Sequence, residues 1–319
     1  MKTENSFKKL FQFKNIIEFQ DKFSSEQACI SYFEEERWKG NAVSPFDPAS
    51  KVWKCKNNRY MCKNTSKYFN VKTGTIFENS KIPLRKWFYI GYIFGNHKKE
   101  ISSCQVAKDI GITQKSADFV LERLRCISNI QLFREMLKGI VEIDETFIGG
   151  KNYNRHKNKK IPHSQGRSSK DKTIVLGMKE RSGNVIFQKV PNTQLSTLLP
   201  IIRTNVDKGS DICSDEWYKN SDLHKDFNHQ IVNHSAGQYA EGKKHTNSIE
   251  SVWALFDRTI IGIYHHISRK RLQKYANEIA FRHNTRKYGE QERFDLLLLS
   301  SIGKRLTYRE LINSPNSQV

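Results

Sequence analysis

The sequence predicts an α+β multidomain protein: a small β-unit, a helix-turn-helix, and then a mixed sheet flanked by helices. Three observations support this prediction. Residues 1–80 are aromatic and turn-rich, residues 81–138 contain capped helices, and residues 139–290 alternate strands with helices. Residues 291–319 are expected to form a helical C-terminal tail. A chain of 319 residues is long enough for two or three domains.

The charge balance indicates a polyanionic partner. Lys and Arg number 54 against 33 Asp and Glu, a formal net charge of +21. Nucleic acid is the first candidate and an anionic membrane surface the second. The longest strongly apolar stretch, Trp87 to Phe94, is far shorter than the ~20 residues that span a bilayer. The N-terminus shows no secretory signal and the six cysteines show no framework spacing, so we expect a cytoplasmic protein with reduced thiols.

The first segment predicts a helix followed by a hairpin. Ser24 and Ser25 can cap a helix that runs to about Trp38, and residues 40–48 form a loop. Residues 52–62 are typical of a hairpin with Asn57 and Asn58 in the turn. In its plainest interpretation, this is a small β-ribbon packed on the helix.

Residues 102–126 have the pattern of a helix-turn-helix. Ser102 caps a short helix, Gly111 permits a tight turn, and Thr113 caps a second helix. In DNA-binding versions, the N-terminal residues of the second helix meet base edges in the major groove. The alternative is an ordinary helical hairpin, but the basic charge favours DNA. The candidates for base contact are Gln114, Lys115 and Ser116.

The third segment predicts a mixed sheet. Strands are expected at 140–148, 173–178, 184–190, 211–215 and 230–233, with helices at 195–206 and 246–258. Residues 179–183 join the second and third strands as a hairpin. Three strands followed by helix, strand, strand and helix are compatible with the ribonuclease H arrangement.

Three carboxylates stand out by their context. Asp144 lies in an apolar strand, Asp215 ends another strand, and Glu250 lies on a helix. Taken singly, they are explained as a salt-bridged strand residue, a helix N-cap and a solvated helix residue. Together, oxygen ligands from three elements suit Mg²⁺ or Mn²⁺. Two such ions about 3.5–4 Å apart activate the attacking oxygen and stabilise the leaving oxygen in phosphoryl transfer.

Five strings of the chain resemble bacterial insertion-sequence DDE transposases. The similar branch joins a zinc ribbon and a helix-turn-helix to a ribonuclease H-like catalytic domain. The strings are Val141–Lys151, Gly209–Trp217, Val232–Ser235, His245–Trp253 and Phe281–Arg286. The 34 residues between Asp215 and Glu250 also match the second interval of the Asp-Asp-Glu pattern.

This resemblance implies a metal-dependent DNA transposase. Asp144, Asp215 and Glu250 would hold two Mg²⁺ or Mn²⁺ ions, with Asn247 assisting from the same helix face. His245 would contact a phosphate or the leaving group, although local capping of the helix explains both residues as well. The implied activity is binding of terminal inverted repeats, strand cleavage and strand transfer, which is DNA recombination. The implied protein is a nucleoid-associated homo-oligomer on double-stranded DNA, without a membrane partner.

A basic loop follows the first acidic strand. Residues 151–172 contain eight Lys or Arg and one acid, Asp171. Such a loop suits phosphate contacts beside the reacting bond, although a solvated charge run is the alternative. The predicted DNA contacts are Lys151, Arg155, Lys157, Lys159, Lys160 and Arg167, together with Arg258 from the 246–258 helix.

The ribbon departs from the family pattern at its metal ligands. The ribbon of the family binds zinc through two Cys-x-x-Cys knuckles. In this chain the four ligand positions are Ser44, Asp47, Cys62 and Thr65, and Cys55 is out of register. Structural zinc needs four ligands that are usually Cys or His, so we expect a metal-free, degenerate ribbon. This loss keeps open a decayed copy that acts as a DNA-binding repressor. A ribonuclease H-like nuclease without strand transfer is a separate alternative.

Overall fold

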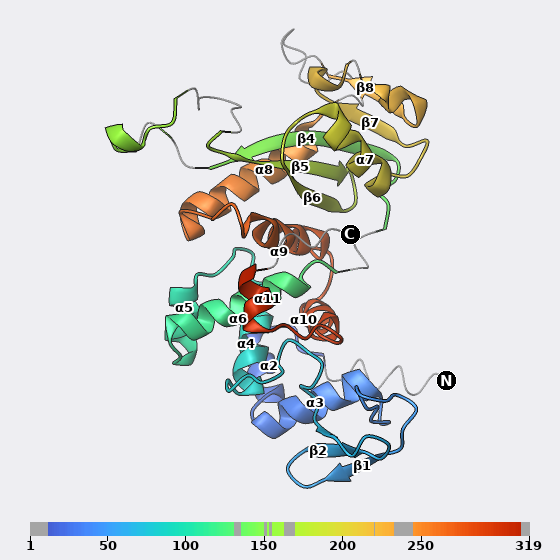
Figure 1. The fold of residues 1–319 in the computed structure, drawn as a ribbon, viewed down its shortest axis with the longest axis vertical. Helices are drawn as coiled ribbons and strands as arrows, with labels where there is room; N and C mark the ends of the chain where they lie inside the picture. Colours follow the sequence, from blue (N-terminus) through green and yellow to red (C-terminus); the bar gives the residue numbers. More distant parts are fainter. Residues whose placement is uncertain are drawn as a thin grey trace. The chain divides into compact units, whose positions relative to one another are not determined.

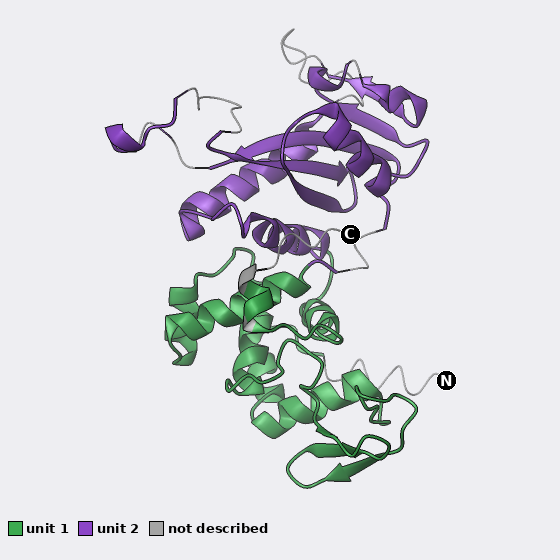
Figure 2. Ribbon diagram, viewed as in Figure 1, with its two compact units in different colours: residues 1–128, 287–319 green, residues 129–286 purple. Residues whose placement is uncertain are grey.

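A computed structural model describes residues 12–130, 135–149, 152, 155–162, 170–219, 221–232 and 245–313. The chain divides into two compact units, residues 1–128 with 287–319, and residues 129–286 (Figure 2). The sequence suggested four segments, 1–80, 81–138, 139–290 and 291–319, whereas the structure places the first, most of the second and the last in one unit. None of the described helices is long and apolar enough to cross a membrane.

An aromatic core holds the first unit together. It brings α2 (Ile16–Lys22), α3 (Glu26–Trp38) and α4 (Leu84–Asn96) against the C-terminal α10 (Glu290–Ser300) (Figure 1). The ring of Phe294 on α10 lies 5.1 Å from Phe88 and 5.4 Å from Phe19. Burial of such rings contributes strongly to hydrophobic stabilisation. Phe294 therefore explains why the C-terminal tail belongs to the N-terminal unit.

A three-stranded antiparallel sheet follows α3. Its order is β1 (Val52–Cys55), β2 (Arg59–Cys62), β3 (Tyr68–Phe69). Asn57 and Asn58 both have positive φ, 59° and 55°, as a tight hairpin turn requires. The predicted hairpin is confirmed, and its inner face buries Tyr60 beside Trp38, with ring centroids 5.0 Å apart.

The helix pair predicted over 102–126 is present. Ser102 caps α5 (Ser103–Ile110), Gly111 turns with a φ of 61°, and Thr113 caps α6 (Gln114–Ile127). One face of α6 is buried, and it consists of Ala117, Val120, Leu121 and Leu124. A short α11 (Tyr308–Asn313) ends the described chain.

The second unit is built on a five-stranded mixed sheet. Its strands are β4 (Ile140–Ile148), β5 (Thr173–Glu180), β6 (Val185–Val190), β7 (Asp211–Ser214) and β8 (Asn228–Ile231). The order is β6-β5-β4-β7-β8 (Figure 1). The β4–β5 and β5–β6 pairs are antiparallel, and the β4–β7 and β7–β8 pairs are parallel. The last strand begins and ends two residues before the predicted 230–233.

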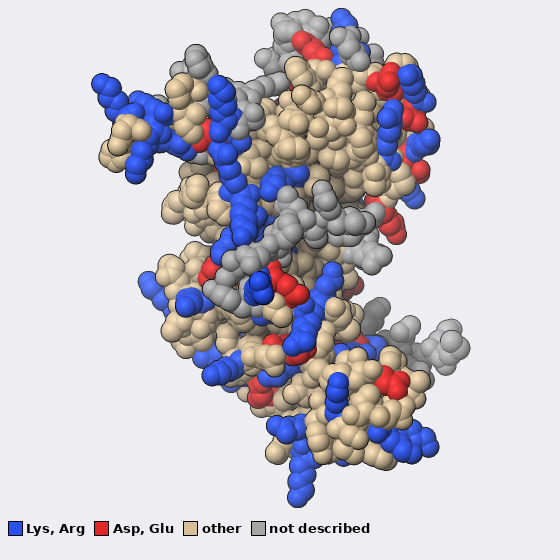
Figure 3. Space-filling view, in the orientation of Figure 1, with Lys and Arg blue, Asp and Glu red and all other residues tan. Residues whose placement is uncertain are grey.

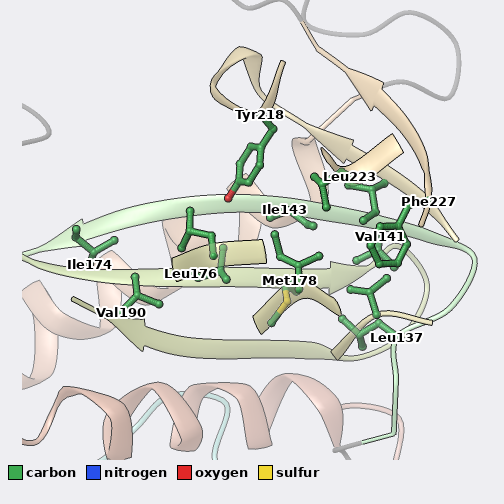
Figure 4. Packing of buried hydrophobic residues seen from close by; sticks show 14 residues of the cluster. Leu137, Val141, Ile143, Ile174, Leu176, Met178, Val190, Tyr218, Leu223 and Phe227 are labelled. Atoms are coloured by element: carbon green, nitrogen blue, oxygen red, sulfur yellow. The ribbon is translucent and has the colours of Figure 1, made fainter. Parts of the chain in front are cut away.

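Helices cover both faces of this sheet. One face packs α7 (Leu195–Asn205) against Val141, Ile143 and Leu176 (Figure 4). The other face packs α8 (Asn247–Thr259) and α9 (Leu272–Asn284) against Val175 and Phe187. Short turns of 3₁₀-helix, η3 (Lys157–Lys159), η4 (Glu216–Tyr218) and η5 (Asp222–Lys225), and the π-helical η6 (Ile260–Tyr264) complete the unit.

Candidate functional site

Strand alternation decides where the acids of β4 point. Val141 and Ile143 face the core under α7, so Glu142 and Asp144 face α8. Glu145 points the opposite way, since Tyr218 from the α7-side core donates a hydrogen bond to its carboxylate. One strand thus delivers acids to both faces of the sheet.

The parallel pair β4–β7 brings Asp144 and Asp215 to neighbouring positions. Glu142 lies opposite Cys213 in the ladder, and the two aspartates are each two residues further along. The strand β7 ends at Ser214, so Asp215 follows at its carboxyl end and caps η4 by accepting from the Trp217 amide at 3.0 Å. The crevice beyond the carboxyl ends of parallel strands is the usual ligand site in such sheets.

Trp253 connects Asp144 to the helix that carries Glu250. Its indole Nε1 donates to Asp144 Oδ2 at 3.0 Å. Glu250 lies three residues before Trp253 and is therefore its neighbour on α8, where it accepts from the Thr246 hydroxyl at 3.0 Å. Gly177 makes this approach possible, because a Cβ there would lie 2.4 Å from the indole ring.

The three predicted ligands lie on or beside elements that contact one another, but they do not form a closed cluster. Across the described ranges, no group of three or more His, Cys, Asp and Glu is arranged to hold a metal ion. Asp144 and Asp215 are aligned, and Glu250 lies on the helix that contacts Asp144. Their chemistry fits Mg²⁺ or Mn²⁺, since all three donors are carboxylates.

A buried carboxylate anchors the start of α8. Glu142 is 0% exposed and accepts from Arg181 Nε at 2.8 Å and from the Ile249 amide at 2.9 Å. The N-cap Thr246 makes no capping bond to the helix backbone, so Glu142 from β4 satisfies one of the amides that the helix start leaves open. The bond fixes α8 against the strand that carries Asp144.

The predicted helpers on α8 lie at its start. His245 Nδ1 is 3.4 Å from Glu142 Oε1, and its carbonyl accepts from Arg181 Nη2 at 3.0 Å. His245 is therefore part of the anchor, and a contact with phosphate stays a prediction. Asn247 is the first residue of α8 and is exposed.

A buried tyrosine packs on the face of β4 opposite Asp144. Tyr218 reaches from η4 toward β4 (Figure 4), where it donates to Glu145. Burial, reinforced by the charges of Glu145, Asp215 and Asp144, raises the pKa of Tyr218 far above its usual value. Its hydroxyl therefore remains protonated and can donate a hydrogen bond in the neighbourhood of these three carboxylates.

The predicted DNA contacts are only partly within the described residues. Lys157, Lys159 and Lys160 are exposed, in a segment covered by basic side chains in Figure 3. Arg155 forms an ion pair with Asp171. Lys151 and Arg167 lie outside the described residues. Exposed as well are Arg258 on α8 and, in the other unit, Gln114 and Lys115, while Ser116 contacts the Thr113 hydroxyl.

The knuckle positions of the ribbon contain hydroxyls around one thiol. Cys62 is 0% exposed. Its desolvation raises the thiol pKa, but hydrogen bonds from Ser44, Ser50 and Thr65 outweigh it and lower the pKa to about 6. Asp47, the remaining knuckle residue, accepts from Asn64 at 2.7 Å. Polar groups here bond to one another, and the expected lack of zinc stays a prediction.

The sequence did not identify several residues that build the site. In the sequence, Glu142 stands out only as part of the Val141–Lys151 string, and Arg181 only as part of the hairpin turn at residues 179–183. Trp253 and Tyr218 were assigned no role. The one available signal was alternation, since Glu142 shares a strand face with Asp144.

A family model and a related sequence support the resemblance. Residues 136–284 match the ISXO2-like transposase domain. A relative from Halobacterium salinarum, an uncharacterized protein in transposable element ISH50, is 26% identical over 285 residues, covering 84% of this chain and 95% of the relative. Two solved structures also match, the Mos1 strand transfer complex and a pre-cleavage Mos1 transpososome. The first is 15% identical with a TM-score of 0.25, and the match covers 72% of this chain and 82% of that one. The second is 14% identical with a TM-score of 0.21, and the match covers 65% of this chain and 76% of that one.

Proposed function

We propose that this chain, whose residues 136–284 match the ISXO2-like transposase domain, cleaves and transfers DNA strands as the transposase of an insertion sequence. One observation carries the proposal: the β4–β7 ladder aligns Asp144 with Asp215 inside that domain. Glu250, on the helix that touches Asp144, completes the acidic set.

The strand order supports a ribonuclease H-like catalytic domain. Three antiparallel strands, β6-β5-β4, continue into two strands parallel to β4, with helices on both faces. This agrees with the arrangement expected from the sequence. The same domain accommodates the acids at a sheet edge, where a phosphodiester can approach.

Asp144, Asp215 and Glu250 are the residues that would hold Mg²⁺ or Mn²⁺. Bound divalent ions supply charge stabilisation to the attacking and leaving oxygens of an in-line displacement. The protein's own contribution is position. Glu142 and Arg181 fix the start of α8, and the Trp253 indole orients the Asp144 carboxylate.

Binding of DNA would use both units. The exposed lysines of residues 157–160 and Arg258 would neutralise phosphates, which gives affinity that falls with salt. In the other unit, α5 and α6 would act as a DNA-reading helix-turn-helix, with Gln114, Lys115 and Ser116 at the bases. We further propose that the protein is a cytoplasmic, nucleoid-associated homo-oligomer when it holds two element ends.

The proposal is tested on duplexes that carry the inverted repeats flanking the gene. The wild type should nick and join these ends with Mg²⁺ and stop when EDTA removes the metal. Asp215→Asn should lose both reactions while end binding survives. Asp211→Asn, at the opposite end of β7, is the matched control and should stay active.

Two outcomes would replace the proposal. Intact end binding without any nicking by the wild type would favour a decayed copy that acts as a repressor. Nicking without strand joining would favour a ribonuclease H-like nuclease.

A further inference from the structure

The small sheet of the first unit has one buried and one open face. Tyr60, Cys62 and Phe69 are buried on the inner face. On the outer face, Trp53 lies opposite Met61, and Met61 lies opposite Tyr68, so the three side chains form a row across three strands. Trp53 and Tyr68 are 48% and 59% exposed.

The segment that forms this sheet is strongly cationic. Residues 51–72 contain seven Lys or Arg and no Asp or Glu. The Lys63 amide donates to the Lys51 carbonyl at 3.0 Å, which continues the β1–β2 pairing by one residue. Alternation then places Lys51 and Lys63 on one side of the aromatic row and Arg59 on the other. All three cations are exposed.

The opposite face differs in charge as well as burial. Lys54 points there, and its Nζ lies 3.8 Å from Glu34 of α3. Glu34 therefore lies against the inner face. The outer face has exposed rings with cations on both sides, and basic side chains are visible around β1 and β2 of the first unit (Figures 1 and 3).

We propose that this outer face binds single-stranded nucleic acid. We call it the ribbon face, and it consists of Lys51, Trp53, Arg59, Met61, Lys63 and Tyr68. One unpaired base stacks on each exposed ring, while the three cations contact the phosphates. Aromatic platforms flanked by positive charge bind single strands without sequence preference, because every base has a π-face.

The chemistry of the face favours this occupant over two others. A duplex keeps its base faces stacked on one another, so it would meet the cations and leave the rings unused. A protein partner would favour a surface depleted in Lys, since desolvating ammonium groups is costly. Rings two strands apart are separated by about 10 Å, which leaves room for a base on each. The proposal goes beyond the transposase chemistry and does not require it.

Binding of a short labelled oligonucleotide to the full-length protein tests the ribbon face. Trp53→Ala and Tyr68→Ala should each weaken single-strand binding about five- to a hundredfold, as expected for one lost stacking platform. Trp53→Phe should retain most of the affinity. Duplex binding should stay at the wild-type value in all three variants. Tyr288→Ala removes an exposed ring outside the sheet and is the matched control.

The cations give a second, independent readout. Lys51→Ala with Lys63→Ala should lower the salt slope of single-strand binding by about 1.4, since each phosphate contact contributes about 0.7. A strand containing iodouridine should photo-crosslink to Trp53 or Tyr68, as mapped by mass spectrometry. Unchanged single-strand affinity in Trp53→Ala/Tyr68→Ala, with unchanged thermal melting, would overturn the proposal. An equal loss of duplex binding would overturn the assignment to single strands.

Discussion

Glu142 and Asp144 lie two residues apart on one face of one strand, yet their surroundings differ sharply. Glu142 is fully buried and is bonded to the Arg181 guanidinium and to a backbone amide of α8. Asp144 is half-buried beside the end of β7 and accepts from the neutral Trp253 indole. The first carboxylate stabilises the position of a helix, and the second lies beside the carboxyl end of β7 and is partly exposed.

The difference shows how a fold separates support from chemistry. A buried charge costs several kcal/mol unless it is paired and hydrogen-bonded, so Glu142 is committed to structure. An acid at the edge of parallel strands retains access to solvent and to cations. The comparison therefore predicts opposite effects on stability and activity for the two residues.

Substitution of Asp144 should separate the two effects most strongly. Asp144→Asn should lower strand cleavage about a thousandfold or more, because divalent ions contribute several kcal/mol to phosphoryl transfer. Binding of element ends and urea denaturation should change little. Gel assays of nicking and binding check this, and normal cleavage by Asp144→Asn would show that the site is elsewhere.

Removal of the buried partner should act first on stability. Glu142→Ala should reduce the free energy of unfolding by about 3–5 kcal/mol, since it leaves the Arg181 charge without its buried partner. Urea denaturation gives the value. The matched surface pair is Arg203 and Asp226, joined at 2.8 Å, and Arg203→Gln should cost less than about 1 kcal/mol. Equal losses in the two variants would contradict the role of Glu142 as an anchor.

Overpacking beneath Trp253 should have an intermediate effect. Gly177→Ala places a methyl group where the indole ring lies, and strain of this kind typically costs about 1–3 kcal/mol. Cleavage should fall as well, since the indole orients Asp144. The double variant with Trp253→Leu should recover stability but not cleavage. A Gly177→Ala protein as stable as the wild type would mean that the indole does not pack on β5.

The smallest predicted effect concerns the ribbon and its pH dependence. The pKa of Cys62 is lowered from 9.0 to about 6, so its thiolate stabilises the fold at high pH. That stabilisation is full above the unfolded pKa and is lost as the pH falls through about 6. The melting temperature of the wild type should therefore fall more between pH 9 and pH 6 than the melting temperature of Cys62→Ala.

Cys29 supplies the control for this measurement. Its pKa is raised to about 12 by burial and by the nearby Glu26 charge, so it remains a thiol over the same range. Cys29→Ala should keep the wild-type dependence on pH. The same dependence in Cys62→Ala would show that the thiolate does not contribute.

Local patterns predicted most of the elements. Alternation defined β4 at residues 140–148, and caps at Ser102 and Thr113 with a turn at Gly111 defined α5 and α6. These features depend on neighbours in sequence. The helix α2 was not predicted, and the position of α10 was not either, because Phe294 finds its aromatic partners about 200 residues earlier in the chain.

The site was predicted less completely, for a related reason. Asp144, Asp215 and Glu250 were selected by context and by family resemblance. The groups that hold them come from distant segments: Arg181 is 39 residues from Glu142, and Trp253 is 109 residues from Asp144. Such pairs depend on strand register and helix packing, which no local pattern specifies.

Crystals soaked in Mn²⁺ test the central claim most directly. Anomalous scattering should show Mn²⁺ bound by the Asp144 and Asp215 carboxylates, with Glu250 drawn into the same coordination shell, and Asp144→Asn crystals should lose that density. Manganese bound elsewhere in the wild type, with these three carboxylates remaining apart, would contradict the account.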